Sequence, residues 1–382
     1  MKILLIITIL FSTSFSMELI SLKKKFKSNI VPVKIESSNK ELKAKLKKRL
    51  KASNRIKFSK KHKYFLLKIE NKKGKIVVEI HKKNSNKIQT FKASNDIKSL
   101  NNLSYELIKI MTKEDKKWLN KNFYIMERTK NKETELMLYD VTGQYSKKVY
   151  KNGKLNIFVK QKNNTEVYFT MVEAGNAELI KLNLKTGKKE VLHKSNNGYL
   201  IVSDIYKNKI LFTKLKKNGT ISIFIFNQKT LKTKEVHRMI SEMNISPKFS
   251  RKNSNEIYYI SVRNKKFEIR LVNLVKQTNR LILKKDSLRQ IDINENDDLL
   301  ISYYNKKKKK YDISLYNRYT MNNEIKLTSV GNNIYPFFLE KTVILYLKGN
   351  KSNKQATILD LKTGETLMFE SSISGNIQSV SY

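Results

Sequence analysis

The sequence predicts a mainly β protein in which a small α+β domain precedes a six-bladed β-propeller. From residue 123 onward, short strand patterns alternate with turns, and no helical period is present. A pair of strand motifs recurs six times in this stretch, every 43–46 residues. Before it, residues 30–112 hold two amphipathic helical patterns among strands. These observations divide the 382 residues into two architectures.

Each repeat contains an apolar strand and then a second strand that ends in Asp or Asn. In three repeats a Gly follows shortly after, which predicts a turn closed by the Asp or Asn side chain and by a glycine with positive φ. A third strand follows the turn, and a more polar fourth strand precedes the next repeat. Four strands per unit indicate a propeller blade with a WD40-like period, whereas an open array of sheets would leave strand edges exposed. The residues that end the second strands are Asp140, Asn183, Asn227, Asn273, Asn317 and Asp360.

The two ends of the repeat region predict how the ring closes. The repeat begins at Phe123, which belongs to the second strand of a blade, and one strand pattern, 376–382, remains after the sixth unit. We expect this C-terminal strand to complete the first blade, because closure removes the exposed edges of an open array. The propeller is therefore assigned to residues 123–382.

Residues 30–112 predict the α+β domain. Asn39 is placed to cap a helix over 40–53, in which Leu42, Leu46 and Leu50 form one apolar stripe. A second helix is expected over 96–111, and strands over 30–35, 64–69, 75–81 and 87–91 should form the sheet that both helices cover. Residues 113–122 read as a polar linker, in which Trp118 is expected to fill a domain interface.

The N-terminus predicts export. Met1-Lys2, an apolar run from Ile3 to Phe11 and small residues up to Ser16 are typical of a Sec signal peptide cleaved after Ser16, with an uncleaved anchor as the alternative. The run is shorter than the roughly 20 residues that span a bilayer. Residues 17–29 would then be the N-terminal segment of a monomeric periplasmic protein that is peripheral to the envelope and does not span a membrane.

The formal charge of +46 admits two interpretations. A cationic surface can bind nucleic acid by displacing counterions. Lys, Asn and Ile are all over-used, however, which is typical of A/T-rich codons, and the lysines are scattered through every segment. The run from Lys306 to Lys310 lies between two strand patterns and is interpreted as a solvated hairpin tip. Together with export, this leads us to expect no nucleic-acid partner.

No catalytic pattern stands out. The chain has no Cys, its four His residues lack metal-ligand spacing, and neither a Gly-x-Ser-x-Gly motif nor a phosphate-binding Gly loop is present. Asp297-Asp298 precedes a strand pattern and is interpreted as a turn. We therefore expect no catalytic residue, no metal and no cofactor, and a protein that is not an enzyme.

The order of signal peptide, α+β domain, propeller and closing strand resembles the TolB family of the Tol–Pal system. Local matches are Asn29 to Val33, Glu135 to Gly143 and the Ser-Pro-containing stretch Ser246 to Ser250. The resemblance implies a periplasmic scaffold for envelope integrity and cell division that binds Pal, a peptidoglycan-associated lipoprotein, at the propeller mouth. It also implies that a TolA-like inner-membrane protein binds the N-terminal segment at Glu18, Leu19, Ile20, Ser21 and Leu22.

Eight residues that precede inner strands are candidates for the propeller mouth, each with ordinary loop capping as the alternative. Two other functions stay open: a periplasmic propeller enzyme, and a module that binds carbohydrate or an anionic surface through the basic charge. The candidate mouth residues are Asn197, Tyr199, Asn244, Ser246, Arg289, Gln290, Asn333 and Tyr335.

Overall fold

The computed structural model describes residues 30–381, except 54, 62–63, 130, 132, 144–145, 197–198, 217, 237–242, 319–322, 329, 350–352, 369–372 and 375. The expected signal peptide, the N-terminal segment with Glu18, Leu19, Ile20, Ser21 and Leu22, and Asn197 lie outside the described residues. The chain forms two units, and each is described by itself. Unit 1 comprises residues 1–121, 140–145 and 358–368, and unit 2 comprises residues 122–139, 146–357 and 369–382.

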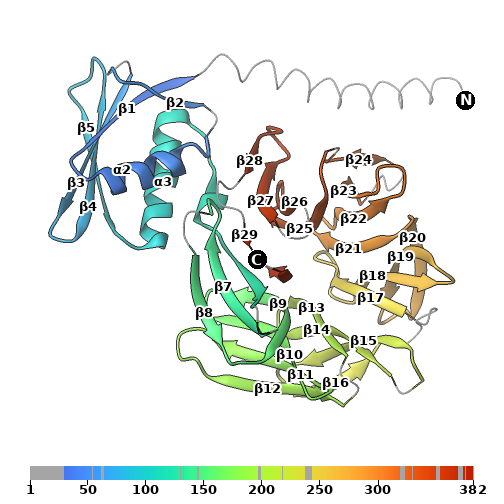
Figure 1. Cartoon of the computed structure of the whole chain (residues 1–382). Helices are drawn as coiled ribbons and strands as arrows, with labels where there is room; N and C mark the ends of the chain where they lie inside the picture. Colours follow the sequence, from blue (N-terminus) through green and yellow to red (C-terminus); the bar gives the residue numbers. More distant parts are fainter. Residues whose placement is uncertain are drawn as a thin grey trace, which may run out of the picture. The chain divides into compact units, whose positions relative to one another are not determined.

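The sheet of unit 1 has the strand order β2-β1-β3-β4-β5 (Figure 1). Strand β1 runs parallel to β2 and β3, while β3, β4 and β5 pair antiparallel. Four of these strands lie where the sequence predicts them, and β2 was not predicted because three residues are too few for a periodic signal. The strands are β1 (Val31–Ser37), β2 (Ile56–Phe58), β3 (Phe65–Lys72), β4 (Lys75–Lys82) and β5 (Ile88–Ser94).

Helices α2 (Lys40–Leu50) and α3 (Ile97–Thr112) cover one face of this sheet, as expected (Figure 1). The Asn39 side chain accepts a hydrogen bond from the Leu42 N–H at 2.9 Å, which confirms the predicted cap. Helix α2 ends three residues before the predicted Ser53, because tighter bonds such as that from the Ala52 N–H to the Arg49 carbonyl close its last turn.

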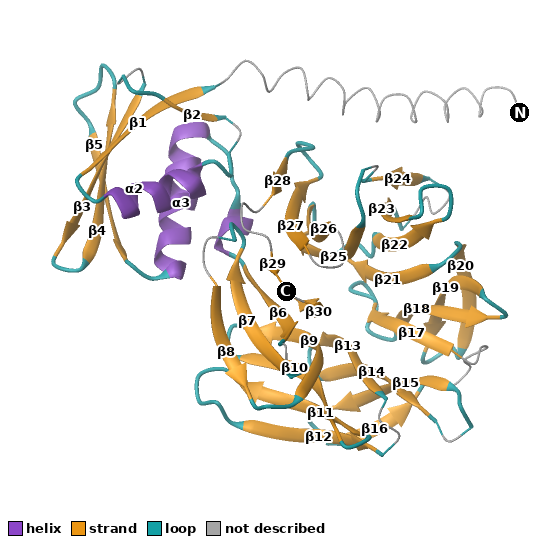
Figure 2. Cartoon of the chain, in the orientation of Figure 1, coloured by secondary structure: helices purple, strands orange, loops and turns teal. Residues whose placement is uncertain are grey.

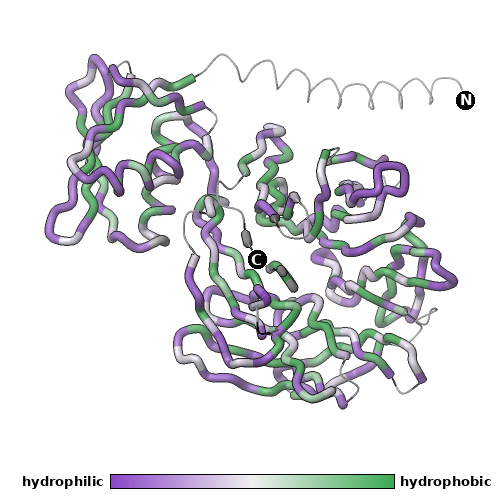
Figure 3. Tube along the Cα trace, in the orientation of Figure 1, coloured by the Kyte–Doolittle hydropathy of each residue, from purple (hydrophilic) through white to green (hydrophobic). Residues whose placement is uncertain are grey.

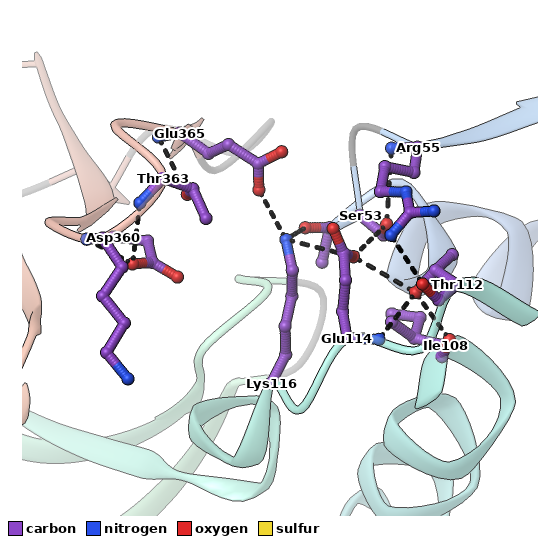
Figure 4. Close-up of polar contacts among 11 residues, drawn as sticks. Ser53, Arg55, Ile108, Thr112, Glu114, Lys116, Asp360, Thr363 and Glu365 are labelled. Atoms are coloured by element: carbon purple, nitrogen blue, oxygen red, sulfur yellow. Dashed lines mark hydrogen bonds and ion pairs between the residues drawn. The ribbon is translucent and has the colours of Figure 1, made fainter. Parts of the chain in front are cut away.

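The predicted linker 113–122 contains a short helix, η2 (Lys117–Asn120), instead of being wholly irregular. Trp118 is buried within it. Beside it, the ammonium of Lys116 donates to the Ala52 carbonyl at 3.1 Å and to the Glu365 carboxylate at 2.6 Å (Figure 4). The chain turn that carries Glu365 is thus held inside unit 1 by a buried charge-assisted bond.

A second buried ion pair lies in unit 1. Arg49 donates to the Asp140 carboxylate at 2.7 Å, and the two side chains are 3% and 0% exposed. Arg49 also donates to the Asn101 side chain, and Asp140 accepts from the Thr142 N–H and hydroxyl. Because burial disfavours an isolated charge, the pKa of Arg49 is lowered by desolvation, against the opposing effect of Asp140.

Unit 2 consists of short β-strands that pack in sheets around a centre (Figures 1 and 2). Figure 3 shows hydrophobic residues concentrated along these strands and hydrophilic residues at many outer turns. The strands from residue 122 onward, of which β28 and the ends of β7 and β27 belong to unit 1, are β6 (Asn122–Arg128), β7 (Thr134–Asp140), β8 (Ser146–Lys151), β9 (Leu155–Asn163), β10 (Glu166–Glu173), β11 (Asn176–Asn183), β12 (Lys189–Ser195), β13 (Leu200–Tyr206), β14 (Lys209–Leu215), β15 (Ile221–Asn227), β16 (Lys232–Glu235), β17 (Met243–Phe249), β18 (Glu256–Arg263), β19 (Lys266–Asn273), β20 (Thr278–Lys284), β21 (Leu288–Ile293), β22 (Leu299–Asn305), β23 (Lys310–Tyr316), β24 (Glu324–Lys326), β25 (Asn333–Glu340), β26 (Val343–Gly349), β27 (Asn353–Asp360), β28 (Thr366–Met368), β29 (Ile373–Ser374) and β30 (Asn376–Ser381).

The prediction of six separate blades is wrong as a count of sheets. Among the described residues, four sheets stand alone: β9–β12, β21–β24, β25–β28 with β29, and β30-β6-β7-β8. The remaining strands, β13–β20, form one eight-stranded sheet, because a parallel pairing of Ile221 with Met243 joins β15 to β17. The arrangement is propeller-like, but two sheets that were expected to be separate are joined through the pairing of β15 with β17.

The predicted closing strand is confirmed. Strand β30 pairs antiparallel with β6, with Val380 opposite Ile125 and Ser381 opposite Tyr124. It packs against β9 and β25 as well. The chain end therefore supplies the missing strand beside Phe123 and removes an open edge.

The predicted Asp or Asn turns also form. The Asn183 side chain accepts from the Lys185 N–H at 2.9 Å, and Asp360 accepts from the Lys362 N–H at 2.9 Å. Gly187 has φ 70°, as the turn requires, but in the turns after Asn227 and Asn273 a non-glycine residue takes this conformation. Those residues are Leu231 and Gln277, with φ 55° and 50°.

Closure of unit 2 can be tested with an engineered disulfide, because the chain has no natural Cys. We expect Val380→Cys with Ile125→Cys to cross-link on mild oxidation, since the two residues are direct partners across β30 and β6. Free-thiol titration and mass spectrometry measure the bond. Val380→Cys with Met126→Cys is the matched control, and equal cross-linking of both pairs would contradict the observed register.

The ion pair of unit 1 predicts a large effect on stability. Arg49→Met should lower the free energy of unfolding by about 3–5 kcal/mol, because it leaves the Asp140 carboxylate buried without its partner charge. Adding Asp140→Asn should cost less than the sum of the single changes. Trp118, the single Trp of the chain, lies in unit 1 and reports urea unfolding by fluorescence. Glu41→Gln, which breaks the exposed pair with Lys45, is the control and should leave the free energy of unfolding nearly unchanged.

Candidate functional site

The inner strands of unit 2, β9, β13, β17, β21, β25 and β30, surround its centre (Figure 2). Each packs against the next in this order, and β30 packs against β9, so the strands form a closed ring. Every one of them contains a register shift at which it has one residue more than the strand beside it. Such β-bulges bend a strand and redirect a side chain. The bulges therefore shape the centre of unit 2.

The bulges direct side chains into one central cavity of about 340 Å³, here called the channel pocket. Phe158, Ser246 and Tyr335 have φ values of 56°, 52° and 53°, which is the strained left-handed region for such residues. Ser203 and Arg289 lie at the corresponding register shifts of β13 and β21. The other residues that line the pocket are Lys160, Tyr199, Ile201, Val202, Thr213, Ile245, Lys248, Gln290 and Val380.

Hydrogen bonds between neighbouring inner strands hold the mouth of the pocket in place. Arg289 donates to the Tyr335 hydroxyl at 3.1 Å, and its guanidinium lies 5.1 Å from the centre of the Tyr335 ring. Gln290 donates to the Pro336 carbonyl at 3.3 Å, and Ser246 accepts from the Ile291 N–H at 3.3 Å. These contacts order the polar groups before any ligand arrives.

Two carboxylates near the pocket, Asp292 and Asp204, each form an ion pair with a cationic side chain. Lys248 lies 2.7 Å from Asp292, and both side chains are largely buried. Arg251 donates to both oxygens of Asp204, at 2.9 and 3.0 Å. Burial raises the pKa of Asp204, but the charges of Arg251 and Lys248 lower it further, so that its pKa lies below the ordinary value.

Lys160 is different, because no hydrogen bond or ion pair joins its ammonium to another described residue. It lies on β9 in the wall of the channel pocket. Desolvation, helped by repulsion from Lys248, lowers the pKa of Lys160 to about 7, although Asp292 and Asp204 favour the charged form. An amine that changes charge near neutral pH thus faces the channel.

The structure brings five of the eight candidate mouth residues together: Tyr199, Ser246, Arg289, Gln290 and Tyr335 line the channel pocket. Two others, Asn244 and Asn333, are buried and form hydrogen bonds to backbone carbonyls instead of lining the pocket. The Asn244 side chain donates to the Ile221 carbonyl, and the Asn333 side chain donates to the Val330 and Gly331 carbonyls. For these two, the capping alternative describes the observed contacts. Asn197 lies outside the described residues.

Sequence reasoning missed Phe158, Lys160, Ser203 and Lys248. Phe158 and Ser203 stand at the same place in the repeat as Ser246, Arg289 and Tyr335, so that extending the repeat to the fourth strand of each unit would have found them. Nothing marks Lys160 among the many lysines of the chain.

A second hollow of about 770 Å³ is lined by residues of β19, β20, β22 and β24 and of the turns after β20 and β22, and is here called the basic groove. Its lysines are partly paired: Lys306 lies 3.0 Å from Asp286, and Lys285 lies 2.8 Å from Glu324. The lining residues are Lys266, Phe267, Glu268, Lys284, Lys285, Asp286, Tyr303, Tyr304, Asn305, Lys306, Lys307 and Lys326. Lys306 and Lys307 come from the predicted basic hairpin tip, which forms between β22 and β23.

The remaining polar candidates serve the fold. Asp297 and Asp298 lie in the turn between β21 and β22, as predicted, and Asp297 accepts from the Ser250 hydroxyl and the Arg251 N–H. Burial lowers the pKa of His193, whose Nδ1 lies 3.3 Å from the Thr233 hydroxyl.

No cluster of three or more His, Asp or Glu side chains in the described part of the chain could hold a metal ion. The helices described there are all too short or too polar to cross a membrane.

The desolvated amine of Lys160 predicts a pH dependence of stability. The pKa of Lys160 is about 7 in the folded protein and 10.5 ordinarily. Between these values the unfolded chain binds more protons, so the free energy of unfolding rises with pH, and the full penalty of burying the charge is present below pH 7. We expect Lys160→Met to flatten this rise when urea midpoints are compared at about pH 6 and about pH 9. Lys276→Met, at an exposed turn, is the control, and parallel pH profiles for wild type and Lys160→Met would contradict the assignment.

Comparisons with known proteins give a consistent result. The chain is 24% identical over 245 residues to the Tol-Pal system protein TolB of Helicobacter pylori, an alignment that covers 62% of this chain and 58% of that protein. It is 28% identical over 125 residues to the TolB protein of Wolinella succinogenes, which covers 32% of this chain and 29% of that protein. The alignments thus span less than two thirds of these relatives, and no family model matches the chain.

Solved structures show the same fold. TolB from Acinetobacter baumannii superposes with a TM-score of 0.70 at 12% identity, covering 92% of this chain and 96% of that one. A chain of the nidogen/laminin complex matches with a TM-score of 0.52 at 8% identity, over 68% of this chain and 98% of that one. With 92% of this chain covered, the match to the TolB structure extends into the α+β part as well as the propeller-like part. In sequence and in fold, this chain is therefore similar to the TolB proteins of the Tol–Pal system.

Proposed function

We propose that the chain is a non-catalytic periplasmic scaffold of a Tol–Pal system, and that a globular partner docks at the mouth of the channel pocket. The observation that carries the proposal is the convergence of Tyr199, Ser246, Arg289, Gln290 and Tyr335 on one cavity. The similarity to TolB proteins supports a role in a Tol–Pal system, and the cavity supports docking of the partner at this mouth.

The chemistry of the mouth suits a protein partner. Tyr and Arg are the side chains that most often dominate the binding energy of an interface. Arg289 lies 5.1 Å from the ring centres of both Tyr311 and Tyr335, so these anchors are already ordered. A preordered surface loses less entropy on binding, and an interface of roughly 1,600 Å² could form around it.

The partners follow from the resemblance. A Pal-like peptidoglycan-associated lipoprotein would occupy the propeller mouth, and a TolA-like inner-membrane protein would bind the N-terminal segment from Glu18 to Leu22. The protein would be exported by its signal peptide, act as a monomer, and contribute to envelope integrity and cell division.

Docking at the mouth can be measured with the soluble domain of a Pal-like lipoprotein from the same organism. Arg289→Ala and Tyr335→Asn should each weaken binding by about 2 kcal/mol or more, which is roughly thirtyfold in Kd. Asn is chosen at position 335 because it tolerates the positive φ of 53° observed there. Isothermal titration calorimetry gives the Kd.

Lys276→Ala, at an exposed outer turn, is the matched control and should leave Kd unchanged. Cross-linking in the intact envelope, followed by mass spectrometry, identifies the natural partner independently. If no lipoprotein is captured, and the purified domain does not bind, the proposed function is wrong.

The basic groove favours a second function, binding of an anionic surface or polymer. Lys266, Lys307 and Lys326 line it without an ion pair to another described residue, and Tyr303 and Tyr304 add aromatic faces. Binding of this kind weakens steeply with added salt. The test is whether the protein is retained on anionic vesicles or cell-wall polymer and is released by added salt. If so, and if Arg289→Ala does not change this retention, the result would favour this function over docking.

A further inference from the structure

The cations around the channel pocket outnumber the carboxylates. Lys160, Lys248 and Arg289 line the pocket, and Arg251 lies close by. Asp292 is paired with Lys248, and Asp204 is paired with Arg251. Lys160 and Arg289 are therefore left without a carboxylate of their own among the described residues.

The charge of Lys160 is unfavourable in the free protein. A cation that is removed from water and not paired loses solvation energy, and the lowered pKa of Lys160 reflects that loss. Arg289 also lines the pocket but is solvent-exposed, so this loss concerns Lys160. A bound anion would compensate the charge of Lys160 and contact Arg289 as well.

The pocket has the form of a site for an anion with an apolar stem. Its volume of about 340 Å³ is larger than a simple inorganic ion needs, and its walls include Phe158, Ile201 and Val380. The guanidinium of Arg289 offers the planar pair of donors that matches a carboxylate. An acidic side chain has both parts, a methylene stem for the walls and a carboxylate for the cations.

We propose that the channel pocket binds the carboxylate of an acidic side chain projecting from the docked partner, with Lys160 and Arg289 as its cationic contacts. This inference rests on the proposed docking function and adds the chemical identity of the group that enters the channel. Because an opposite charge favours the ammonium form, the bound carboxylate raises the pKa of Lys160, and binding is tighter below about pH 7 than above it.

The first experiment needs no partner. The wild-type chain is acetylated at pH 8 with a water-soluble acetylating reagent, and the rate at each lysine is read by mass spectrometry. The probes are N-acetyl-glutamate amide, N-acetyl-glutamine amide and inorganic phosphate. We expect the glutamate probe to slow acetylation of Lys160 several-fold, because only the neutral amine reacts, and to leave exposed Lys276 unchanged. The glutamine probe should have no effect, and Arg289→Gln should weaken the protection while Lys276→Gln should not.

Two results of this experiment overturn the inference. Equal effects of the glutamate and glutamine probes would show that the pocket does not select a carboxylate. Protection by phosphate at lower concentration than by the glutamate probe would assign the pocket to a free anion and not to an acidic side chain.

The second experiment separates this inference from the proposed function. Lys160→Met should raise the Kd for the Pal-like lipoprotein domain at least several-fold at pH 6, with a smaller effect at pH 8.5, while Lys160→Arg should retain most of the binding. If the lipoprotein binds wild type and Lys160→Met equally well at both pH values, docking stands and the carboxylate contact is wrong. If the lipoprotein does not bind wild type at all while the glutamate probe protects Lys160, the docking function is wrong and the anion pocket stands.

Discussion

The antiparallel pairing of β30 with β6 is the constraint on which unit 2 depends. It joins the last described residues of the chain to a strand more than 240 residues earlier, with Val380 opposite Ile125. Without it, β6 would have an unpaired edge, and the ring of inner strands would lack a member between β25 and β9. Once the ring is closed, each inner strand faces the same centre. The channel pocket is a product of this closure, since its lining residues come from β9, from β30 and from the strands between them.

The bulges turn this ring into a site. A regular strand would alternate its side chains between the two neighbouring sheets, as the repeated apolar residues do in the cores around Phe169 and Ile301. The extra residue interrupts that alternation, and in β9, β13, β17, β21 and β25 a residue at the bulge lines the channel pocket. At Phe158, Ser246 and Tyr335 the backbone takes a strained positive φ to achieve it. Strain of this kind persists where the surrounding structure enforces it, and such places are often functional.

Charge is distributed in two ways in this protein. Most lysines are solvent-exposed, and the exposed ion pairs such as Lys45 with Glu41 contribute little. Among the described residues, the largely buried pairs include Arg49 with Asp140, Lys116 with Glu365, and Lys248 with Asp292, and each is supported by specific geometry. Lys160 belongs to neither group, because it is desolvated and has no ion-pair partner among the described residues. That difference in environment, and not the total charge, distinguishes it from the other lysines.

The sequence alone determined those features whose signals are local. The cap at Asn39, the stripe of Leu42, Leu46 and Leu50, and the turns after Asn183 and Asp360 depend on residues a few positions apart, and they form as predicted. The period of the strands also predicted the closing role of β30, because one strand was missing at one end and one remained at the other.

Only the tertiary structure decided what depends on distant residues. The bridge between Ile221 and Met243 merges two sets of strands into one sheet, and no periodicity reveals a single pairing. The repeat placed Tyr199, Arg289 and Tyr335 near strand starts, but a spacing cannot show that Asn244 and Asn333 bond to backbone instead of facing the pocket. The pKa of Lys160 depends on desolvation and on Lys248, Asp292 and Asp204, which come from three other inner strands. Such long-range electrostatic surroundings exist only after folding.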